Sequence, residues 1–505
     1  MFAQTYGAVT YGLQGHRISV EVDIANGLPG FEIVGLAAAA VRESKERVRA
    51  AIKNSGYEFP LRRITINLAP ADLKKDSAGL DLPIALGILT ASGQIPEEAV
   101  HHALCVGELS LEGKVRGVSG VLSMVADATG QDLTELLIAE ENKAEALLYG
   151  KGNVYGIRDL RQAVRHLLKE ELLMPEVYEK GEEAFTEYTE DFSEVQGQLL
   201  AKRALEIAAA GGHNVLMVGP PGSGKTMLAR RINTILPPMT REEALEVTKI
   251  YSVAGLYSGA GIAGARPFRS PHHTISSAGL IGGGTIPKPG EVTLSHHGVL
   301  FLDELPEFPR AVLEVLRQPL EDGCVHISRV NASLDYPSAF VMIAAMNPCP
   351  CGFLNDGHKE CTCSIGEIRR YTRKISGPLL DRIDLHVQVL RPEYHELTAA
   401  IPAESSAEIR KRVIAARRKQ EARLAPYGIS CNGQMKHKQL KETCPITKEG
   451  EKILAQVFES LQLSARSYDR LIKVARTIAD LANADTIEAV HVAETVSFRN
   501  SLPQW

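Results

Sequence analysis

Three short, almost wholly apolar runs mark the middle of the chain: Val215–Val218, Gly298–Leu302 and Phe340–Ala345. Such runs are typical of strands that are buried on both faces of a parallel sheet. Each run is followed by polar residues, and the carboxyl ends of parallel strands lie along one edge of their sheet. The pattern therefore predicts an α/β domain that gathers its chemistry at that edge.

The first 170 residues mix alternating and helical periodicities instead. The elements expected here are strands at His16–Ile24, 64–68 and 105–109 and helices at Gly35–Ser55 and 82–91. They predict a separate α+β domain at residues 1–170. An acidic stretch at 171–190, interrupted by proline and glycine, indicates a linker. An amphipathic helix is expected at 193–212, just before the first apolar run.

That first apolar run leads into a glycine-rich turn of the form G-x-x-x-x-G-K-[ST]. Glycines let successive backbone N–H groups point at an anion, and the following helix adds the positive end of its dipole. We expect Lys225 to reach the β- and γ-phosphates and Thr226 to ligate Mg²⁺. The predicted nucleoside-triphosphate site comprises Gly219, Pro220, Pro221, Gly222, Ser223, Gly224, Lys225 and Thr226.

The other two runs end in side chains suited to hydrolysis. Asp303 and Glu304 follow the second run, and Asn347 follows the third. We expect Asp303 to hold Mg²⁺, Glu304 to polarise the attacking water and Asn347 to orient it. An acidic turn after a buried strand is common in itself, but its position after a phosphate loop favours an ATP site that uses Mg²⁺.

Length, composition and net charge indicate what kind of protein carries this site. The chain has 505 residues, of which 44% are hydrophobic and 23% are charged, so two to four ordinary globular domains are expected. Its net charge of −5 argues against a generally basic nucleic-acid coat and leaves room for a local basic channel. No apolar run is long enough to span a membrane, and the first residues lack a charged leader with an apolar core. We therefore expect a cytoplasmic protein without membrane contacts.

Four of the eight cysteines fall in one short segment, CPCGFLNDGHKECTC. Cys349, Cys351, Cys361 and Cys363 form two C-x-C pairs, which predict a structural zinc site bracing the loop after Asn347. The C-x-C spacing is tighter than the usual C-x₂-C, and four reduced cysteines without metal are the alternative.

The runs RPFRSPHHTIS, GVLFLDELPEF, AAMNPCPCG and SGPLLDRIDLHV resemble the YifB/ComM family of magnesium-chelatase-like AAA+ ATPases. The resemblance covers nearly the whole chain and implies an AAA+ core at 191–392 with a helical lid at 393–505, assembled as a homo-hexameric ring. It also implies a branch-migration helicase that acts on branched or single-stranded DNA in natural transformation. In the family pattern, Arg382 matches the arginine finger that reaches a neighbour's γ-phosphate, and Arg466 matches the sensor 2 arginine of the lid.

Two insertions in the core carry candidate DNA contacts. The glycine-rich segment 259–291 contains Lys288, and the hairpin-like segment 326–336 contains Arg329. In the helicase-like AAA+ clade that this chain resembles, such insertions face the central pore, where cationic side chains would meet phosphates. Packing against the next subunit is the alternative.

The two histidine pairs and one basic helix are not expected to form functional sites. The adjacent pairs His272–His273 and His296–His297 are expected to point to opposite faces of a strand, and so not to share a metal. The basic helix at 407–423 is more often a solvated face than a DNA contact.

The first domain resembles the proteolytic domain of Lon proteases, on a ribosomal-S5-like fold. In that family a serine before an Ala-Gly pair is the nucleophile, and Ser77 occupies that position. The lysine that would activate it is missing, since the matching position is near Leu122. Ser77 is therefore expected to begin a helix in a non-proteolytic scaffold.

Three functions from different classes compete on this sequence. A ring motor acting on DNA is favoured, and a chelatase-type ATPase that remodels a protein partner is the alternative. The missing lysine argues against the third, a Lon-type protease. The first domain, expected to be absent from the chelatase motor subunit, argues against the remodelling ATPase.

Overall fold

The structure is a computed structural model that describes residues 1–130, 132–149, 151–177, 188–259, 261–284, 288–329, 332–391, 403–460, 462 and 464–499. The chain divides into two compact units, Met1–Ala184 with Ala244–Ala263 and Phe185–Glu243 with Gly264–Trp505. The sequence predicts a division near residue 170, but it does not predict that 244–263 joins the first unit. Among the described helices, none has the length and apolar character needed to cross a membrane.

The first unit is built on a seven-stranded mixed sheet in the order β3-β4-β2-β1-β5-β8-β9. β1 and β2 form a long antiparallel hairpin, whereas β1, β5, β8 and β9 run parallel. A separate small hairpin pairs β6 with β7. The strand bounds are β1 (Phe2–Tyr11), β2 (Gln14–Ala25), β3 (Gly30–Val34), β4 (Arg63–Ala69), β5 (Ala103–Val106), β6 (Glu108–Leu109), β7 (Val115–Arg116), β8 (Glu135–Ala139) and β9 (Asn153–Ile157).

Helices cover both faces of this sheet. The side chains of Cys105 and Leu137 lie in the core on one face of the sheet. Those of their neighbours, Leu104 and Leu136, lie in the core on the other face, because successive side chains of a strand alternate between faces. The first core is closed by α1 (Ala39–Asn54), α2 (Asp81–Ala91) and α5 (Leu160–Leu167), and the second by α3 (Val121–Ala128) and α4 (Lys143–Leu147). The strands predicted at 16–24 and 64–68 and the helices predicted at 35–55 and 82–91 are confirmed as β2, β4, α1 and α2.

The segment 244–263 joins the first unit through most of α8 (Arg241–Val253). The Ser252 hydroxyl hydrogen-bonds to the Glu145 carboxylate, which also accepts the Leu122 N–H at 2.8 Å. Lys249 Nζ lies 3.4 Å from Asp127 Oδ1. Polar contacts to α3 and α4 thus hold a segment that lies, in sequence, inside the predicted ATPase core.

The second unit contains a five-stranded sheet in the order β11-β14-β17-β10-β18. The strands are β10 (Val215–Val218), β11 (Phe268–Arg269), β14 (Val299–Leu302), β17 (Val341–Met346) and β18 (Leu385–Gln388). All adjacent pairs are parallel, and every residue of β10 and β14 is buried. The three apolar runs are therefore confirmed as central parallel strands, and their carboxyl ends share one edge.

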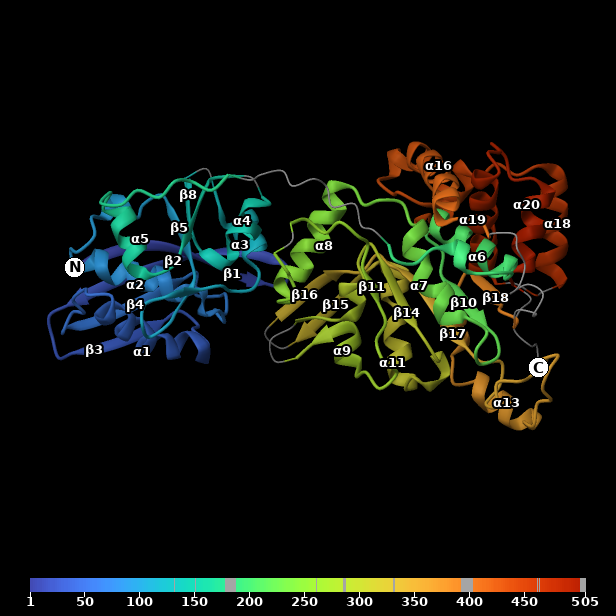
Figure 1. The fold of residues 1–505 in the computed structure, drawn as a ribbon, viewed down its shortest axis with the longest axis horizontal. Helices are drawn as coiled ribbons and strands as arrows, with labels where there is room; N and C mark the ends of the chain where they lie inside the picture. Colours follow the sequence, from blue (N-terminus) through green and yellow to red (C-terminus); the bar gives the residue numbers. More distant parts are fainter. Residues whose placement is uncertain are drawn as a thin grey trace. The chain divides into compact units, whose positions relative to one another are not determined.

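One face of this sheet packs against α6 (Leu199–Gly211) and α7 (Lys225–Ile235), and α16 (Ser406–Leu424) and α19 (Ala465–Leu481) pack on these helices in the same core (Figure 1). α6 is shorter than the helix predicted at 193–212, because Gly197 and Gln198 have φ of 63° and 54°. The C-terminal helices α16, α17 (His437–Thr443), α18 (Lys448–Ser460), α19 and α20 (Ala489–Ser497) enclose a further small core. Residues 392–402, at the predicted start of the lid, lie outside the described residues.

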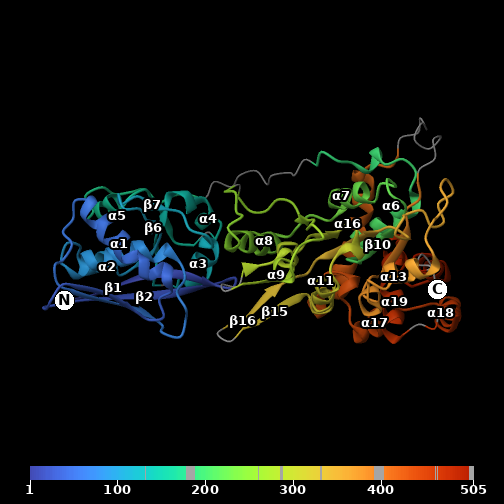
Figure 2. The same ribbon diagram turned by 90° about the horizontal axis from the view of Figure 1, so that it is seen from below.

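Short elements connect the strands of the second unit. They are α9 (Ser277–Ile281), β12 (Gly282–Gly283), β13 (Lys288–Pro289), α10 (Glu291–Leu294), α11 (Arg310–Glu314), α12 (Pro319–Asp322), β15 (Cys324–Arg329), β16 (Ala332–Pro337), α13 (Ile365–Thr372) and α14 (Gly377–Leu380). β12 pairs with β13, and β15 pairs with β16 in the hairpin that the sequence predicts at 326–336 (Figure 2).

Candidate ATP site

The phosphate loop joins β10 to α7 at the carboxyl edge of the sheet. Gly224 has φ of +88°, a conformation that favours glycine. A Cβ at Gly219 would lie 2.1 Å from the Val389 carbonyl oxygen, so the close approach of these two backbones requires glycine. Lys225 begins α7, and its Nζ turns back to donate to the carbonyl oxygens of Gly219 at 2.7 Å and Pro220 at 2.9 Å.

Side chains from the ends of two neighbouring strands converge on Lys225. Its Nζ lies 3.3 Å from Asn347 Oδ1, directly after β17. Burial lowers the pKa of Lys225, and the charges of Asp303 and Glu304, directly after β14, oppose that shift. An amine held by loop carbonyls at a helix N-terminus is placed to contact a phosphate oxygen.

The two predicted magnesium ligands touch each other. Thr226 Oγ1 donates to Asp303 Oδ2 at 2.8 Å. Thr226 is exposed and Asp303 is half-buried. A hydroxyl and a carboxylate open to solvent match the oxygen ligands that Mg²⁺ prefers and leave space for its water ligands. The residues present therefore fit a magnesium ion that arrives with the nucleotide.

Glu304 occupies a strained position next to a histidine. Its φ of 52° lies in the left-handed region. This backbone conformation costs conformational energy in a residue with a Cβ, and residues strained in this way are found most often at functional sites. Its side chain is 58% exposed, and His273 Nδ1 lies 3.6 Å from its Oε2. The His273 ring also packs edge-on against Phe308. The sequence reasoning missed this contact, for which the SPHHTIS string was the available signal.

The expectation that each histidine pair points to opposite faces of a strand is wrong. The rings of His272 and His273 lie 4.1 Å apart, and those of His296 and His297 lie 3.9 Å apart. His273, His296 and His297 lie in turns and His272 in irregular backbone, where adjacent side chains need not alternate as they do in a strand.

The two predicted arginines meet at one carboxylate. Arg466 Nη2 lies 2.5 Å from Glu321 Oε1, and Arg382 Nη2 hydrogen-bonds to Glu321 Oε2. Arg382 also donates to the Pro378 carbonyl oxygen at 2.7 Å, and its side chain is only 7% exposed. Glu321 lies 61 and 145 residues away from its two partners, so only the tertiary fold brings the three together.

Burial opposes ionisation of Glu321, but the hydrogen bond and charge of Arg382 and the charge of Arg466 lower its pKa. Among the described residues, the neighbouring carboxylates Asp381 and Asp384 form no ion pair with Arg382. Asp384 instead lies 3.2 Å from Arg470 Nη1.

This arginine pair lies at the edge of the sheet opposite the phosphate loop. Asn214 immediately precedes β10, and its Nδ2 donates to the Arg382 carbonyl oxygen at 3.1 Å. Lys225 follows the other end of the same strand. Four residues of parallel strand separate the two edges by about 13 Å. Arg382 and Arg466 are therefore placed away from the phosphate loop of their own chain.

The four clustered cysteines converge in space. Their Sγ atoms all lie within 4.8 Å of one another. Cys349 Sγ lies 3.4 Å from Cys351 Sγ and 3.6 Å from Cys361 Sγ, and the Cys351 N–H donates to Cys363 Sγ at 3.4 Å. Zn–S bonds of about 2.3 Å in a tetrahedron place sulfurs about 3.8 Å apart. The donor set fits a zinc ion.

Ser77 has the structural position that the sequence predicts. Its Oγ accepts the Gly79 N–H at 3.1 Å at the start of a short 3₁₀ helix, Ala78–Leu80. Leu122 is fully buried in α3. Lys75, the nearest lysine in sequence, is also buried, and its Nζ donates to the Pro70 carbonyl oxygen. Within the described part of the chain, no lysine or histidine nitrogen hydrogen-bonds to Ser77 Oγ.

The predicted DNA contacts lie on the two hairpins of the second unit. Lys288 is exposed on β13. Arg329 ends β15, but its side chain lies outside the described residues. The structure therefore places one of the two candidates on an accessible surface.

Comparison with known proteins finds matches along nearly the whole chain. Three family models match in succession: Subunit ChlI of Mg-chelatase at 20–142, Magnesium chelatase, subunit ChlI at 191–397, and Magnesium chelatase, subunit ChlI C-terminal at 403–499. The uncharacterized protein YifB of Salmonella typhimurium is 44% identical over 495 residues, which cover 97% of this chain and 95% of that protein. The competence protein ComM of Haemophilus influenzae is 42% identical over 501 residues, 98% and 97% of the two chains. The chain belongs to the YifB/ComM family of magnesium-chelatase-like AAA+ ATPases.

Proposed function

We propose that this chain is an ATP-driven motor that works as a hexameric ring on branched or single-stranded DNA. Its family supports an AAA+ ATPase and implies the use of ATP and Mg²⁺. The ring, the DNA substrate and the roles of individual residues go beyond what the family implies.

The residues of the phosphate-loop edge divide the hydrolytic work. Lys225 contacts the β- and γ-phosphate oxygens, and Glu304 accepts a proton from the attacking water while Asn347 orients that water. Thr226 and Asp303 hold the magnesium ion, which supplies charge neutralisation at the phosphates when bound. The proximity of Lys225 to Asn347 and of Thr226 to Asp303 supports this division.

The observation that carries the ring is the position of the arginine pair. Hydrolysis of the γ-phosphate needs cationic groups that stabilise charge in the transition state. Arg382 and Arg466 lie at the far edge of their own sheet, held together by Glu321. A head-to-tail ring brings that edge to the phosphate loop of the next subunit, so each site is completed by its neighbour.

The DNA substrate is supported by the relatives and by the hairpins. ComM is named a competence protein, and this chain is similar to it from end to end. Lys288 is exposed on a glycine-rich hairpin, where backbone and ammonium group can both approach a phosphate. We extend the same role to Arg329 on the second hairpin.

Two structural roles complete the proposal. The cysteine cluster holds one zinc ion, because four sulfurs at these separations need only a small adjustment to form a tetrahedron. The domain at 1–170 acts as a non-proteolytic scaffold, joined by the linker 171–190 to the core at 191–392 and the lid at 393–505.

The test measures ATP turnover and strand exchange on a synthetic four-way DNA junction. ATPase stimulation by the junction, strand displacement that requires ATP, and six-subunit particles with ATP would support the motor. Lys225→Ala protein serves as the matched inactive control. Hydrolysis unaffected by any DNA, with no displaced strand, would overturn the DNA part of the proposal.

The alternative function is that of a chelatase-type ATPase that remodels a protein partner. The family models at 20–142 and 191–397 are both described as chelatase subunits, so the presence of the first domain does not exclude this alternative. Stimulation by a protein partner, with none by DNA, would favour it.

A further inference from the structure

A strongly basic cavity lies beside the ATP site, at the carboxyl edge of the sheet. It has a volume of about 720 Å³ and two walls, residues 306–310 after β14 and residues 366–374 of α13 and the following turn. Four of the six residues from Arg369 to Lys374 are cationic, and Arg310 belongs to the other wall. We call this feature the arginine cavity.

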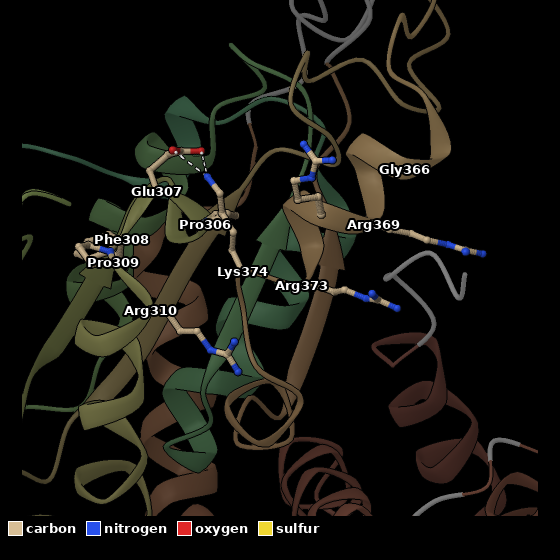
Figure 3. Close-up of a pocket in the computed structure, with 10 residues that line it drawn as sticks. Pro306, Glu307, Phe308, Pro309, Arg310, Gly366, Arg369, Arg373 and Lys374 are labelled. Atoms are coloured by element: carbon tan, nitrogen blue, oxygen red, sulfur yellow. Dashed lines mark hydrogen bonds and ion pairs between the residues drawn. The ribbon is translucent and has the colours of Figure 1, made fainter.

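Buried anchors fix the orientation of the arginines. Ile368 and Tyr371 are buried under α13, which turns the remaining side chains outward. Arg369 and Arg373 are four residues apart and therefore share one helical face, about 6 Å apart along the axis. Figure 3 shows these two side chains extending in the same direction from α13, with Arg310 on the opposite wall.

Most cations of the cavity have no ion-pair partner among the described residues. Glu307, the carboxylate in the cavity wall, lies 3.3 Å from Lys374 Nζ and is engaged by that lysine (Figure 3). Across the described residues, none of the other cations in the cavity forms a salt bridge; they are Arg310, Arg369, Arg370 and Arg373. Four like charges around one cavity repel one another unless an external anion binds.

We infer that the arginine cavity binds the backbone phosphates of a DNA strand. This inference rests on the proposed function and adds a contact site separate from the two hairpins. Guanidinium groups pair with phosphate oxygens through two parallel hydrogen bonds, and two arginines one helical turn apart present two such forks to a strand. The net charge of the chain is −5, so binding to a polyanion needs a local concentration of positive charge such as this one.

Two features favour a strand of DNA over an acidic peptide. Pro306 and Pro309 in the wall have no N–H to offer a peptide backbone, whereas phosphate recognition needs only the cationic side chains. Both walls also follow strands of the sheet: residues 306–310 come directly after Glu304 and β14, and α13 follows Asn347 and β17 after the cysteine segment. A strand in the cavity would therefore touch elements that sense the state of the nucleotide.

The test compares full-length Arg369→Ala/Arg373→Ala protein with wild type. Binding of a fluorescent single strand is titrated over a series of salt concentrations, with the slowly hydrolysed analogue of ATP present. Loss of two phosphate contacts lowers the slope of log affinity against log salt by about 1.4. The same counterion release corresponds to a roughly 15-fold loss of affinity at about 0.15 M salt. Arg369→Lys/Arg373→Lys protein should keep most of the slope, because the charges remain.

The control removes two exposed cations from the basic helix, Lys411→Ala/Arg418→Ala, and should leave the slope unchanged. An equal slope in the Arg369→Ala/Arg373→Ala and wild-type proteins would overturn the inference while leaving the DNA motor intact. Wild-type protein that binds no DNA would overturn both. Displacement of the strand by pyrophosphate at a concentration equal to its phosphate content would show a site for free phosphate, and displacement by an acidic peptide a protein site; either result would overturn the DNA assignment.

Discussion

Replacing Arg382 tests the ring, the mechanism and the position of the arginine pair together. Because Arg382 lies at the sheet edge opposite its own phosphate loop, we expect Arg382→Ala protein to bind ATP as wild type does. Turnover should nevertheless fall by about 10³-fold, since the transition-state charge at the neighbouring site loses its arginine. Wild-type specific activity should also rise with protein concentration, because a complete site needs two chains.

A catalytic effect has to be separated from a loss of stability. A 10³-fold fall in turnover corresponds to about 4 kcal/mol of transition-state stabilisation. Arg382 is only 7% exposed and also donates to the Pro378 carbonyl oxygen, so its removal costs the folded state more than the roughly 1 kcal/mol of an exposed ion pair. Glu321 is 43% exposed and keeps Arg466 as a partner, which limits that cost. The thermal unfolding of the variant is therefore measured beside its turnover, and a folded variant with collapsed turnover is the expected result.

The decisive assay mixes two inactive proteins. Arg382→Ala subunits supply Glu304, and Glu304→Gln subunits supply Arg382, so a complete site forms wherever the two meet in the right order. In a randomly mixed head-to-tail ring, about one interface in four is complete. The mixture should hydrolyse ATP faster than either parent. Normal turnover by Arg382→Ala protein at all concentrations, or a mixture no faster than its parents, would refute the arrangement.

Lys225→Ala should abolish ATP binding, measured with a fluorescent nucleotide, because charge and phosphate contact are lost together; retained binding would contradict the phosphate-loop assignment. Glu304→Gln should bind ATP but hydrolyse it slower by orders of magnitude, since the water loses its base; an unchanged single-turnover rate would rule Glu304 out as that base. Ser77→Ala should leave ATPase activity intact and change no peptide cleavage, and a lost ATP-dependent peptidase would reverse the scaffold assignment. Metal analysis should find about one zinc per chain and much less in Cys361→Ser protein, whereas zinc-free, fully folded wild type would exclude the zinc site.

The sheet of the second unit could be predicted from the sequence because its signals are local. Val215–Val218 and the other two apolar runs are only four to six residues long and are bounded by polar or turn residues, which is typical of strands that are buried on both faces. The phosphate loop is similarly local, because the residues from Gly219 to Thr226 are contiguous and their glycines allow the backbone turn. The placement of Asp303, Glu304 and Asn347 at one edge could be predicted because the carboxyl ends of parallel strands share that edge.

The first strand of the chain and the course of segment 244–263 could not be predicted in the same way. β1 begins with an exposed Phe2 and ends in half-buried residues, so its pattern is not a clean alternation. Its place in the sheet depends on pairing with β2 and β5. Segment 244–263 joins the first unit through Ser252 and Lys249, whose partners are more than 100 residues away. Single polar side chains in a helix give no signal of such distant partners.

The amino-acid sequence by itself determined the chemistry of the ATP site, because phosphate binding needs a short contiguous loop and strands whose ends align by topology. Tertiary structure alone decided which distant side chains meet. It brought Arg382 and Arg466 to Glu321, His273 to Glu304, and the two walls of the arginine cavity to one place. The physical reason is that these contacts join residues from separate elements, and their geometry exists only after the sheet and its helices have packed.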